Sequence, residues 1–388
     1  MKTFLRVAPL SVILFMPVIL VIAKDKKQQK PQPKDFFAFA GTYTTKTQSK
    51  GIYAFRYDAT SGKLTALGVA AETPDPSFVA IHPSGKFLYA VNEGGKASFV
   101  TSFALDAKTG KLTQLNQVPA LGEDPCYIAL DQTGKYILIA NYSSGTIAVF
   151  PILPDGKIGE KTAVNQDNGK LGSNKERQDG PHAHWIETST DNRYVLAVDL
   201  GLDQVLIFQF DAKKGTLGPH IPPSAALKAG SGPRHGIFSP NGKFFFVVSE
   251  LASTATSFSY DAKTGDLKQV NSVSTLPSDF SGRNDVAEVA IHPSGRFLYV
   301  SNRGADSIAL FSVDTKKGTL TQISAVPTGG KEPRHFTLDP SGNFLFAENQ
   351  WSDTIVTFHV DANTGALTPT GENVSVPSPV CLKFIAAE

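Results

Sequence analysis

Short apolar runs alternate with turns rich in Gly, Pro and Asn along most of this chain. Runs such as FLYAV (87–91), VLIFQF (205–210) and FFFVV (244–248) have the length and the aromatic and β-branched content of buried strands. After residue 35, no long segment repeats its apolar residues with the 3.6-residue period of an amphipathic helix. The pattern therefore predicts an all-β protein.

A turn phrase that starts at an Asp and contains a Gly recurs along the chain. The copies are DATSGKLT (58–65), DAKTGKLT (106–113), DGKI (155–158), DAKKGTL (211–217), DAKTGDL (261–267), DTKKGTLT (314–321) and DANTGALT (361–368). Successive copies begin 47 to 56 residues apart. A repeat near 50 residues without helical patterning is typical of the blades of a β-propeller.

A second repeated turn joins the first two strands of each blade. Its copies are HPSGK (82–86), DQTGK (131–135), STDNR (189–193), SPNGK (239–243), HPSGR (292–296) and DPSGN (339–343). Five residues before each turn is one set of positions, and sixteen residues further along is another. Because a hairpin returns to its starting face and the first strand of a blade lines the channel, both sets should ring one channel mouth. The first set is Ser77, Cys126, His184, Arg234, Ala287 and Arg334, and the second is Glu93, Tyr142, Leu200, Glu250, Arg303 and Gln350.

The two ends of the repeat array are incomplete in complementary ways. Residues 36–42 align with a second strand that has no first strand before it, and residues 380–384 align with a first strand that nothing follows. Joining them would complete a blade and remove the exposed sheet edges. We therefore expect residues 36–388 to form a seven-bladed β-propeller, closed by the C-terminal strand in the N-terminal blade.

The N-terminal segment has the order of an export signal. Lys2 and Arg6 precede an uncharged, largely apolar run (7–23) that ends in Val21-x-Ala23. We expect residues 1–23 to be a signal peptide and residues 24–35 to be a disordered linker. The mature protein would then be exported, periplasmic or secreted, without stable membrane insertion. The alternative is a retained membrane anchor, although seventeen residues interrupted by Pro9 and Pro17 suit it poorly.

Charge and cysteine content limit the possible partners. The formal net charge is +2, and the segment 1–23 contributes both excess positive charges through Lys2 and Arg6. A neutral mature protein is not expected to bind nucleic acid. The two cysteines, Cys126 and Cys381, lie far apart on inner strands, so we expect both to be reduced and buried. We expect a monomer that binds a small anionic molecule.

Residues shared by equivalent positions in many blades should serve the blade itself. His82 and His292 belong to the repeated turn, where we expect them to bond the turn. The column Asn92, Asn141, Asp199, Ser249, Asn302 and Asn349 should satisfy loop backbone groups at strand ends. This column has too few carboxylates to form a metal ring, and we expect no metal or other cofactor.

The two channel-mouth sets contain residues that depart from this blade-wide pattern. They are His184, Arg234 and Arg334 in the first set and Glu93, Glu250 and Arg303 in the second. Buried charges of this kind must pair with one another or with a ligand. They could form a structural belt of ion pairs, or an anion site with an acid–base pair. His235 and His335 follow two of the arginines, and either packing or ligand contact would explain them.

One loop is longer than its equivalents. The extra residues lie in NQDNGKLGSNKERQDGPHAH (165–184), on the same face as the channel mouth. The loop could be a lid that brings Arg177 and His182 over the site, or a surface insertion without a role.

Several segments together resemble the propeller-type lactonase family, which includes 6-phosphogluconolactonases and carboxymuconate lactonizing enzymes. The segments are ERQDGPHAH (176–184), DLGLDQV (199–205), GPRH (232–235), SEL (249–251), AEVAIHPSGRFLYVSNRG (287–304) and EPRHFTLDPSGNFLFAENQ (332–350). The resemblance extends from residue 36 to the C-terminus. It implies that His184, Arg234, Glu250 and Arg303 are catalytic. Ser249 departs from the family, which commonly has Asn there.

The resemblance favours a metal-independent lactone hydrolase most like 6-phosphogluconolactonase, although an export signal puts that cytosolic substrate in doubt. Hydrolysis needs an activated water, a stabilised oxyanion and a proton for the leaving ring oxygen. Glu250 or His184 would supply base and acid, in an order that stays open. Arg234 would face the oxyanion, while Arg303 and Arg334 would hold an anionic group. The alternatives are a carboxymuconate cycloisomerase and a non-catalytic exported propeller that binds a sugar acid.

Overall fold

The computed structural model describes residues 1–5 and 35–387, and residues 35–387 form the propeller. The expected signal peptide and linker fall mainly on residues 6–34, which lie outside the described residues. In the described part, no helix has the length and apolar character needed to cross a membrane. Apart from the strands, this part has two short 3₁₀ helices, η1 (Gly95–Ala97) and η2 (Gln350–Ser352).

Seven four-stranded antiparallel sheets make up residues 35–387, as expected from the repeats. From the innermost strand outward, the first four are β28 (Pro379–Ala386), β1 (Asp35–Thr42), β2 (Gly51–Asp58) and β3 (Lys63–Glu72); β4 (Val79–Ile81), β5 (Phe87–Asn92), β6 (Phe99–Leu105) and β7 (Leu112–Pro119); β8 (Pro125–Leu130), β9 (Tyr136–Asn141), β10 (Thr146–Pro151) and β11 (Ala163–Gln166); and β12 (Ala183–Thr188), β13 (Tyr194–Asp199), β14 (Gln204–Asp211) and β15 (Thr216–Ala226). The other three are β16 (Pro233–Phe238), β17 (Phe244–Ser249), β18 (Thr254–Tyr260) and β19 (Leu267–Ser274); β20 (Asp285–Ile291), β21 (Phe297–Arg303), β22 (Ser307–Val313) and β23 (Leu320–Pro327); and β24 (Pro333–Leu338), β25 (Phe344–Asn349), β26 (Thr354–Val360) and β27 (Leu367–Ser375).

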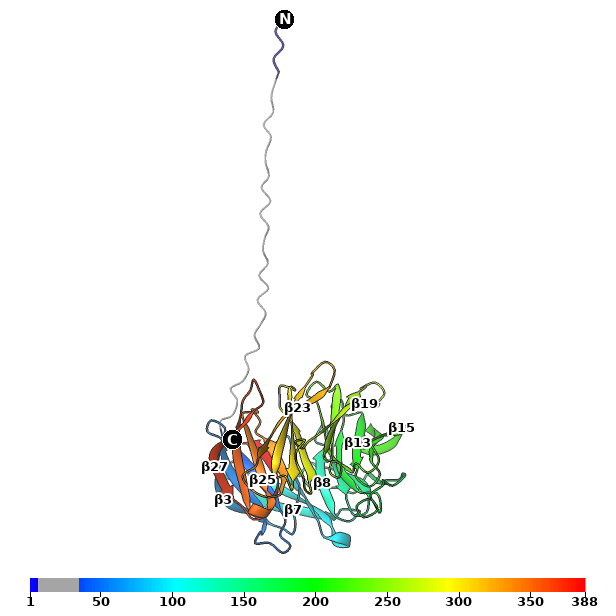
Figure 1. Ribbon diagram of the computed structural model, residues 1–388, viewed down its shortest axis with the longest axis vertical. Helices are drawn as coiled ribbons and strands as arrows, with labels where there is room; N and C mark the ends of the chain where they lie inside the picture. The colour runs from blue at the N-terminus through cyan, green and yellow to red at the C-terminus, as the bar shows by residue number, and fades with distance from the viewer. Residues whose placement is uncertain (6–34, 388) are drawn as a thin grey trace. The chain divides into compact units, whose positions relative to one another are not determined.

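The innermost strands form a closed ring around the channel. Each packs against the innermost strands of the two neighbouring sheets, in the order β28, β4, β8, β12, β16, β20, β24 and back to β28. Figure 1 shows the sheets side by side, with C-terminal and N-terminal strands in one blade. The middle strands of the blades are almost wholly buried because both faces of each sheet are covered by the next blade.

Closure by the C-terminal strand is confirmed. β28 pairs with β1 in an antiparallel ladder that runs from Phe36 opposite Ala386 to Gly41 opposite Cys381. At the seam, Tyr57 lies edge-on against Phe346 of the last blade, with ring centroids 5.3 Å apart. The chain ends therefore share one blade and one hydrophobic core.

The repeated Asp-to-Gly turn joins the two outer strands of a blade and also locks one blade onto another. In one copy, Asp106 accepts hydrogen bonds from the Lys108 amide and the Thr109 hydroxyl, which fixes the turn. Gly110 has a φ of 72°, and a Cβ there would lie 2.9 Å from the Phe37 ring of the neighbouring blade. Both the positive φ and the close approach require glycine.

The blade-wide polar residues behave as expected. His82 bonds Ser84 inside its own turn and the Gly134 carbonyl of the next blade's turn. Strand-end amides bond loop carbonyls, for example Asn92 to Pro74 and Asn302 to Thr275. The Ser249 hydroxyl is the exception, because it has no hydrogen-bond partner among the described residues.

Deleting the chain from Val380 onward should unfold the propeller or leave it insoluble. The deletion removes the innermost strand of the first blade, including Cys381 and Leu382, which are fully buried. A control protein that ends at Ile385 keeps most of the ladder with β1 and should remain folded. Solubility, limited proteolysis and the thermal unfolding transition measure the difference. A soluble truncated protein with an unchanged transition would contradict closure by β28.

Candidate active site

The first channel-mouth set coincides with a repeated β-bulge. In four innermost strands the ladder to the second strand skips one residue near the mouth. The skipped residues are Cys126, His184, Arg234 and Arg334. A bulge bends the strand and re-aims the extra side chain. The bulges therefore explain why one sequence column delivers side chains to a common centre.

A cavity of about 390 Å³ lies among the ends of the channel hairpins. Of the candidates from the sequence, its lining includes Glu93, Arg177, His184, Glu250, Arg303 and Arg334. The lining also includes residues that were not singled out, namely Asp124, Cys126, Tyr142, Ser143, Arg283 and Asp285. Most of the two predicted sets therefore meet in one cavity.

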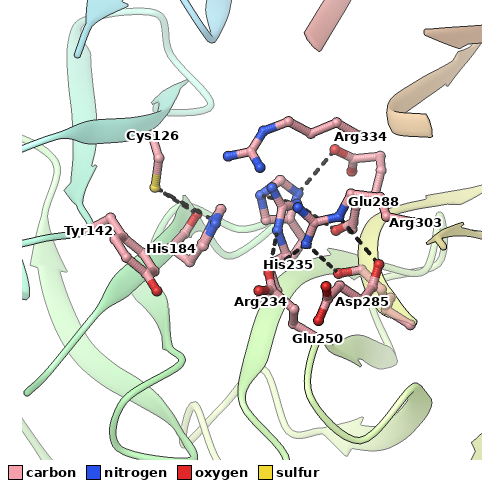
Figure 2. A network of polar contacts seen from close by, with 12 residues as sticks. Cys126, Tyr142, His184, Arg234, His235, Glu250, Asp285, Glu288, Arg303 and Arg334 are labelled. Atoms are coloured by element: carbon pink, nitrogen blue, oxygen red, sulfur yellow. Dashed lines mark hydrogen bonds and ion pairs between the residues drawn. The ribbon is translucent and has the colours of Figure 1, made fainter. Parts of the chain in front are cut away.

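The Glu250 carboxylate is the centre of the charged network (Figure 2). Its Oε1 lies 2.6 Å from Nη2 of Arg177, and its Oε2 lies 2.8 Å from Nη2 of Arg303. Nε of Arg234 lies 3.1 Å from the same Oε2, at an angle that makes it an ion pair without hydrogen-bond geometry. One carboxylate thus holds three guanidinium groups that come from two strands and a loop.

This arrangement decides the charge state of Glu250. Burial alone would raise the pKa of the carboxyl, but Arg303, Arg234, His184 and Arg177 together hold it well below its usual range. Glu250 is therefore ionised throughout the physiological pH range, so it cannot donate a proton. Since its oxygens are already occupied by three cations, it is also a weak base.

His184 is the neutral group in the cavity. Burial, with the positive charge of Arg234, lowers the pKa of His184 well below its ordinary value. Its Nδ1 lies 3.5 Å from Sγ of Cys126, and Nε2 makes no hydrogen bond with a described residue. The ring packs edge-on against Tyr142, with centroids 5.4 Å apart. An imidazole with one free ring nitrogen can accept a proton from a water molecule in the cavity.

Arg334 differs from the other buried arginines. Its Nη2 donates to the Tyr43 hydroxyl at 3.1 Å, and Tyr43 donates to Glu93 at 2.8 Å. No carboxylate of the described residues lies within 4 Å of its guanidinium, whereas Arg177, Arg234 and Arg303 share Glu250 and Arg283 pairs with Asp285. Burial raises the pKa of Glu93, which weakens its countercharge further. Arg334 is therefore the guanidinium with donors to spare.

The long loop reaches the site, as one of the two hypotheses for it expected. It brings Arg177 over Glu250, and Gln178 secures it by bonds to the Leu200 carbonyl and Asp203. His182 is not among the residues that line the cavity. Its ring stacks on Tyr142 at 4.6 Å, and its Nδ1 faces the Tyr142 carbonyl at 3.1 Å.

Arg234, His235 and His335 lie beside a much smaller space of about 10 Å³, which shares Glu93, Cys126 and Arg334 with the cavity. Both histidines are 2% exposed. Among the described residues, no group of three or more His, Cys, Asp or Glu side chains is arranged to hold a metal ion.

Sequence reasoning missed two kinds of cavity residue. Tyr43 follows β1 in the shared blade, where no aligned hairpin guided the count. Cys126 and Tyr142 occupied the predicted columns, but their residue types did not mark them as unusual. The sequence signal for both was their position in the column. Both cysteines are unpaired and buried, as expected.

Seven sheets around a channel with a charged central cavity define a polar-site β-propeller. The family described as "Lactonase, 7-bladed beta-propeller" matches residues 37–384. The chain belongs to this family, whose class of activity is the hydrolysis of lactones.

Named relatives cover almost the whole chain. It is 35% identical to a 6-phosphogluconolactonase of Bacillus subtilis over 353 residues, which are 90% of this chain and 98% of the relative. The structure of a periplasmic gluconolactonase of Pseudomonas aeruginosa is similar, with a TM-score of 0.86, 32% identity, and coverage of 91% of this chain and 100% of the neighbour. A protein of Lactobacillus plantarum has a TM-score of 0.84 at 34% identity, with coverage of 90% and 99%.

Replacing Glu250 with Gln should destabilise the protein strongly. Three guanidinium groups would lose their shared anion in a buried site, and breaking a buried ion pair typically costs about 3–5 kcal/mol. Glu72→Gln is the matched control, because the Lys50–Glu72 pair is exposed and its loss should cost about 0–1 kcal/mol. Urea unfolding at pH 7 measures both free energies. Equal stabilities of the two variants would show that Glu250 is not the electrostatic centre.

Proposed function

We propose that the protein hydrolyses the lactone of a sugar acid in the cavity at the channel mouth, without a metal ion. The observation that carries this proposal is the pairing of a buried neutral imidazole, His184, with an uncompensated guanidinium, Arg334, in one cavity. The first can accept a proton from water, and the second can stabilise a negatively charged oxygen. The lactonase family and its named members support the choice of a lactone as substrate.

The reaction follows from these two groups. Nε2 of His184 takes a proton from a water molecule while the water oxygen attacks the lactone carbonyl carbon. The carbonyl oxygen becomes the oxyanion of a tetrahedral intermediate. When the intermediate collapses, the bond from this carbon to the ring oxygen breaks, and the imidazolium returns its proton to that oxygen. The product is the open-chain sugar acid.

Arg334 is our candidate for the oxyanion, in place of Arg234. The Nη1 donor of Arg234 is used by the Ala287 carbonyl at 2.7 Å, and its Nε faces Glu250. Arg334 lines the cavity and keeps donors free beyond its bond to Tyr43. Donors that are already oriented in a water-poor site typically lower the barrier by roughly 2.7–4 kcal/mol. Glu250 then acts by holding Arg177, Arg234 and Arg303 in place.

The distribution of charge favours an unphosphorylated lactone. A single uncompensated guanidinium suits the one negative charge of an oxyanion. A phosphate dianion would have to break one of the pairs around Glu250 or Asp285 to gain a second partner. The export expected from residues 1–23 is part of the proposal, because sugar-acid lactones outside the cytoplasm need not be phosphorylated.

Purified protein should hydrolyse glucono-δ-lactone with a kcat/KM about tenfold or more above that for 6-phosphogluconolactone, roughly 1.4 kcal/mol in barrier. A pH-indicator assay corrected for spontaneous hydrolysis measures both rates. Asp285→Asn would release Arg283 and should shift the preference toward the phosphorylated lactone. Preference of the wild type for the phosphorylated lactone would contradict the charge argument. Turnover of carboxymuconate alone would favour the cycloisomerase, and binding without turnover would favour a non-catalytic propeller.

His184→Gln should lower kcat by about 10²–10⁴, the usual contribution of a general base. His82→Gln is the matched control, because His82 lies in a hairpin turn and should leave kcat unchanged. Circular dichroism and thermal unfolding would establish that both variants are folded. Retention of kcat in the folded His184 variant would remove it from the mechanism.

The pH dependence provides an independent test. A general base is active when unprotonated, so kcat/KM falls as the pH falls through its pKa. Since burial lowers the pKa of His184 below its ordinary value of 6.5, the acidic decline should lie below that pH. We expect kcat/KM, corrected for spontaneous hydrolysis, to be flat between about pH 6.5 and 8. A decline centred near pH 6.5 or above would contradict a buried neutral His184 as the base.

A further inference from the structure

A second layer of side chains lies next to the bulge residues in the channel. Each occupies the position after a member of the first channel-mouth set. The layer consists of Phe78, Tyr127, Trp185, His235, Glu288 and His335, all of them buried. Three successive blades thus contribute aromatic rings, and the next three contribute a His–Glu–His sequence. The polar half has no role in the mechanism described above.

The polar half continues directly into Arg234 (Figure 2). Nη1 of Arg234 lies 3.2 Å from Nε2 of His235, and Nδ1 of His235 lies 3.0 Å from Oε2 of Glu288. The same Oε2 lies 3.5 Å from Nε2 of His335. Nδ1 of His335 lies 2.6 Å from Oε2 of Glu348. Four side chains therefore form one chain of contacts that ends at Arg234.

The donors and acceptors in this chain are fixed by what Arg234 can do. A guanidinium only donates, so Nε2 of His235 must accept and its proton must sit on Nδ1. Nδ1–H then donates to Glu288, which must be an ionised acceptor. Burial, with the charge of Arg234, lowers the pKa of His235 well below its ordinary value, which agrees with a neutral ring.

The far end of the chain is neutral. Glu348 is fully buried, and burial raises its pKa well above its usual range, so it is protonated at neutral pH. Its hydroxyl donates to Nδ1 of His335, whose own pKa burial lowers to about 3. Nε2–H of His335 is then directed to Glu288. The single negative charge of the chain is on Glu288, whose Oε1 also accepts from the Val289 amide at 3.0 Å.

We propose that Glu288 is a positioning residue that acts through His235 on Arg234. The Ala287 carbonyl and His235 hold one end of the guanidinium, and Glu250 faces its Nε. Arg234 in turn helps to hold Glu250 and with it the arginines that border the cavity. The proposal rests on the proposed function, since its main readout is hydrolysis of the lactone.

Glu288→Gln and Glu348→Gln form a matched pair for the test. Gln at 348 replaces a protonated acid with a neutral donor of the same shape, so kcat should stay within about twofold of wild type. Gln at 288 removes the charge that orders the chain, so kcat should fall about tenfold with KM nearly unchanged, because a small misplacement of a catalytic group is costly. Equal effects of the two variants, or a loss of stability with unchanged kcat in Glu288→Gln, would overturn the proposal.

A double-mutant cycle with Arg234→Lys tests whether Glu288 acts through Arg234. If it does, Glu288→Gln should have little further effect on kcat in the Arg234→Lys background. Additive losses would indicate an independent structural role. Should Glu288→Gln fail to fold, Glu288→Asp keeps the charge but withdraws it by one methylene. It should lower kcat by several-fold, and an unchanged kcat would contradict the proposal.

A final measurement separates this proposal from the proposed function. If the wild type hydrolyses neither lactone, the proposed function fails. The ¹⁵N resonances of the His235 ring then test the chain without any substrate. They should show a neutral ring protonated at Nδ1 in the wild type and a changed signal in Glu288→Gln. An imidazolium, or a proton on Nε2, would overturn the positioning role.

Discussion

The pairing of β28 with β1 is the constraint on which the rest of this structure depends. The hydrogen bonds from Phe36–Ala386 to Gly41–Cys381 turn an open row of sheets into a ring. Only in a closed ring do the innermost strands of all blades face one axis. Residues separated by more than a hundred positions, such as His184 and Arg334, can then border one cavity. Closure is thus the precondition of the site as well as of the fold.

Within the ring, chemistry arises where the repeat is broken. A propeller that used the same side chain at the bulge of every blade would gather like groups at its axis. This chain places a thiol, an imidazole and two guanidinium groups at four successive opportunities. The next position inward shows the same division, with aromatic rings in three blades and His235, Glu288 and His335 in the others. Symmetry supplies the scaffold, and the departures from it supply a polar centre.

The charges of this centre are nearly self-compensating. Glu250 neutralises much of the charge of three arginines, and Glu288 provides an anion near Arg234 in the layer below. The cost of burying these ions is offset by their mutual pairing. What remains is one imidazole kept neutral by burial and one guanidinium without a close carboxylate. A belt of structural ion pairs and a catalytic site are therefore compatible here, since the belt holds the groups that the reaction uses.

Much of the architecture could be predicted from the sequence alone, because it depends on local, repeated patterns. The Asp-to-Gly turns and the hairpin turns report backbone geometry within a few residues, so the blade count, the shared blade and the two channel-mouth columns followed from spacing. Only the tertiary structure decided how these side chains pair. The bulges that direct Arg234 toward Glu250, the loop that brings Arg177 to the same carboxylate, and the contact of Tyr43 with Arg334 all join residues far apart in the chain. The protonation states of Glu250 and His184 depend on the same long-range contacts, since a pKa is determined by burial and neighbouring charge and not by position in a repeat.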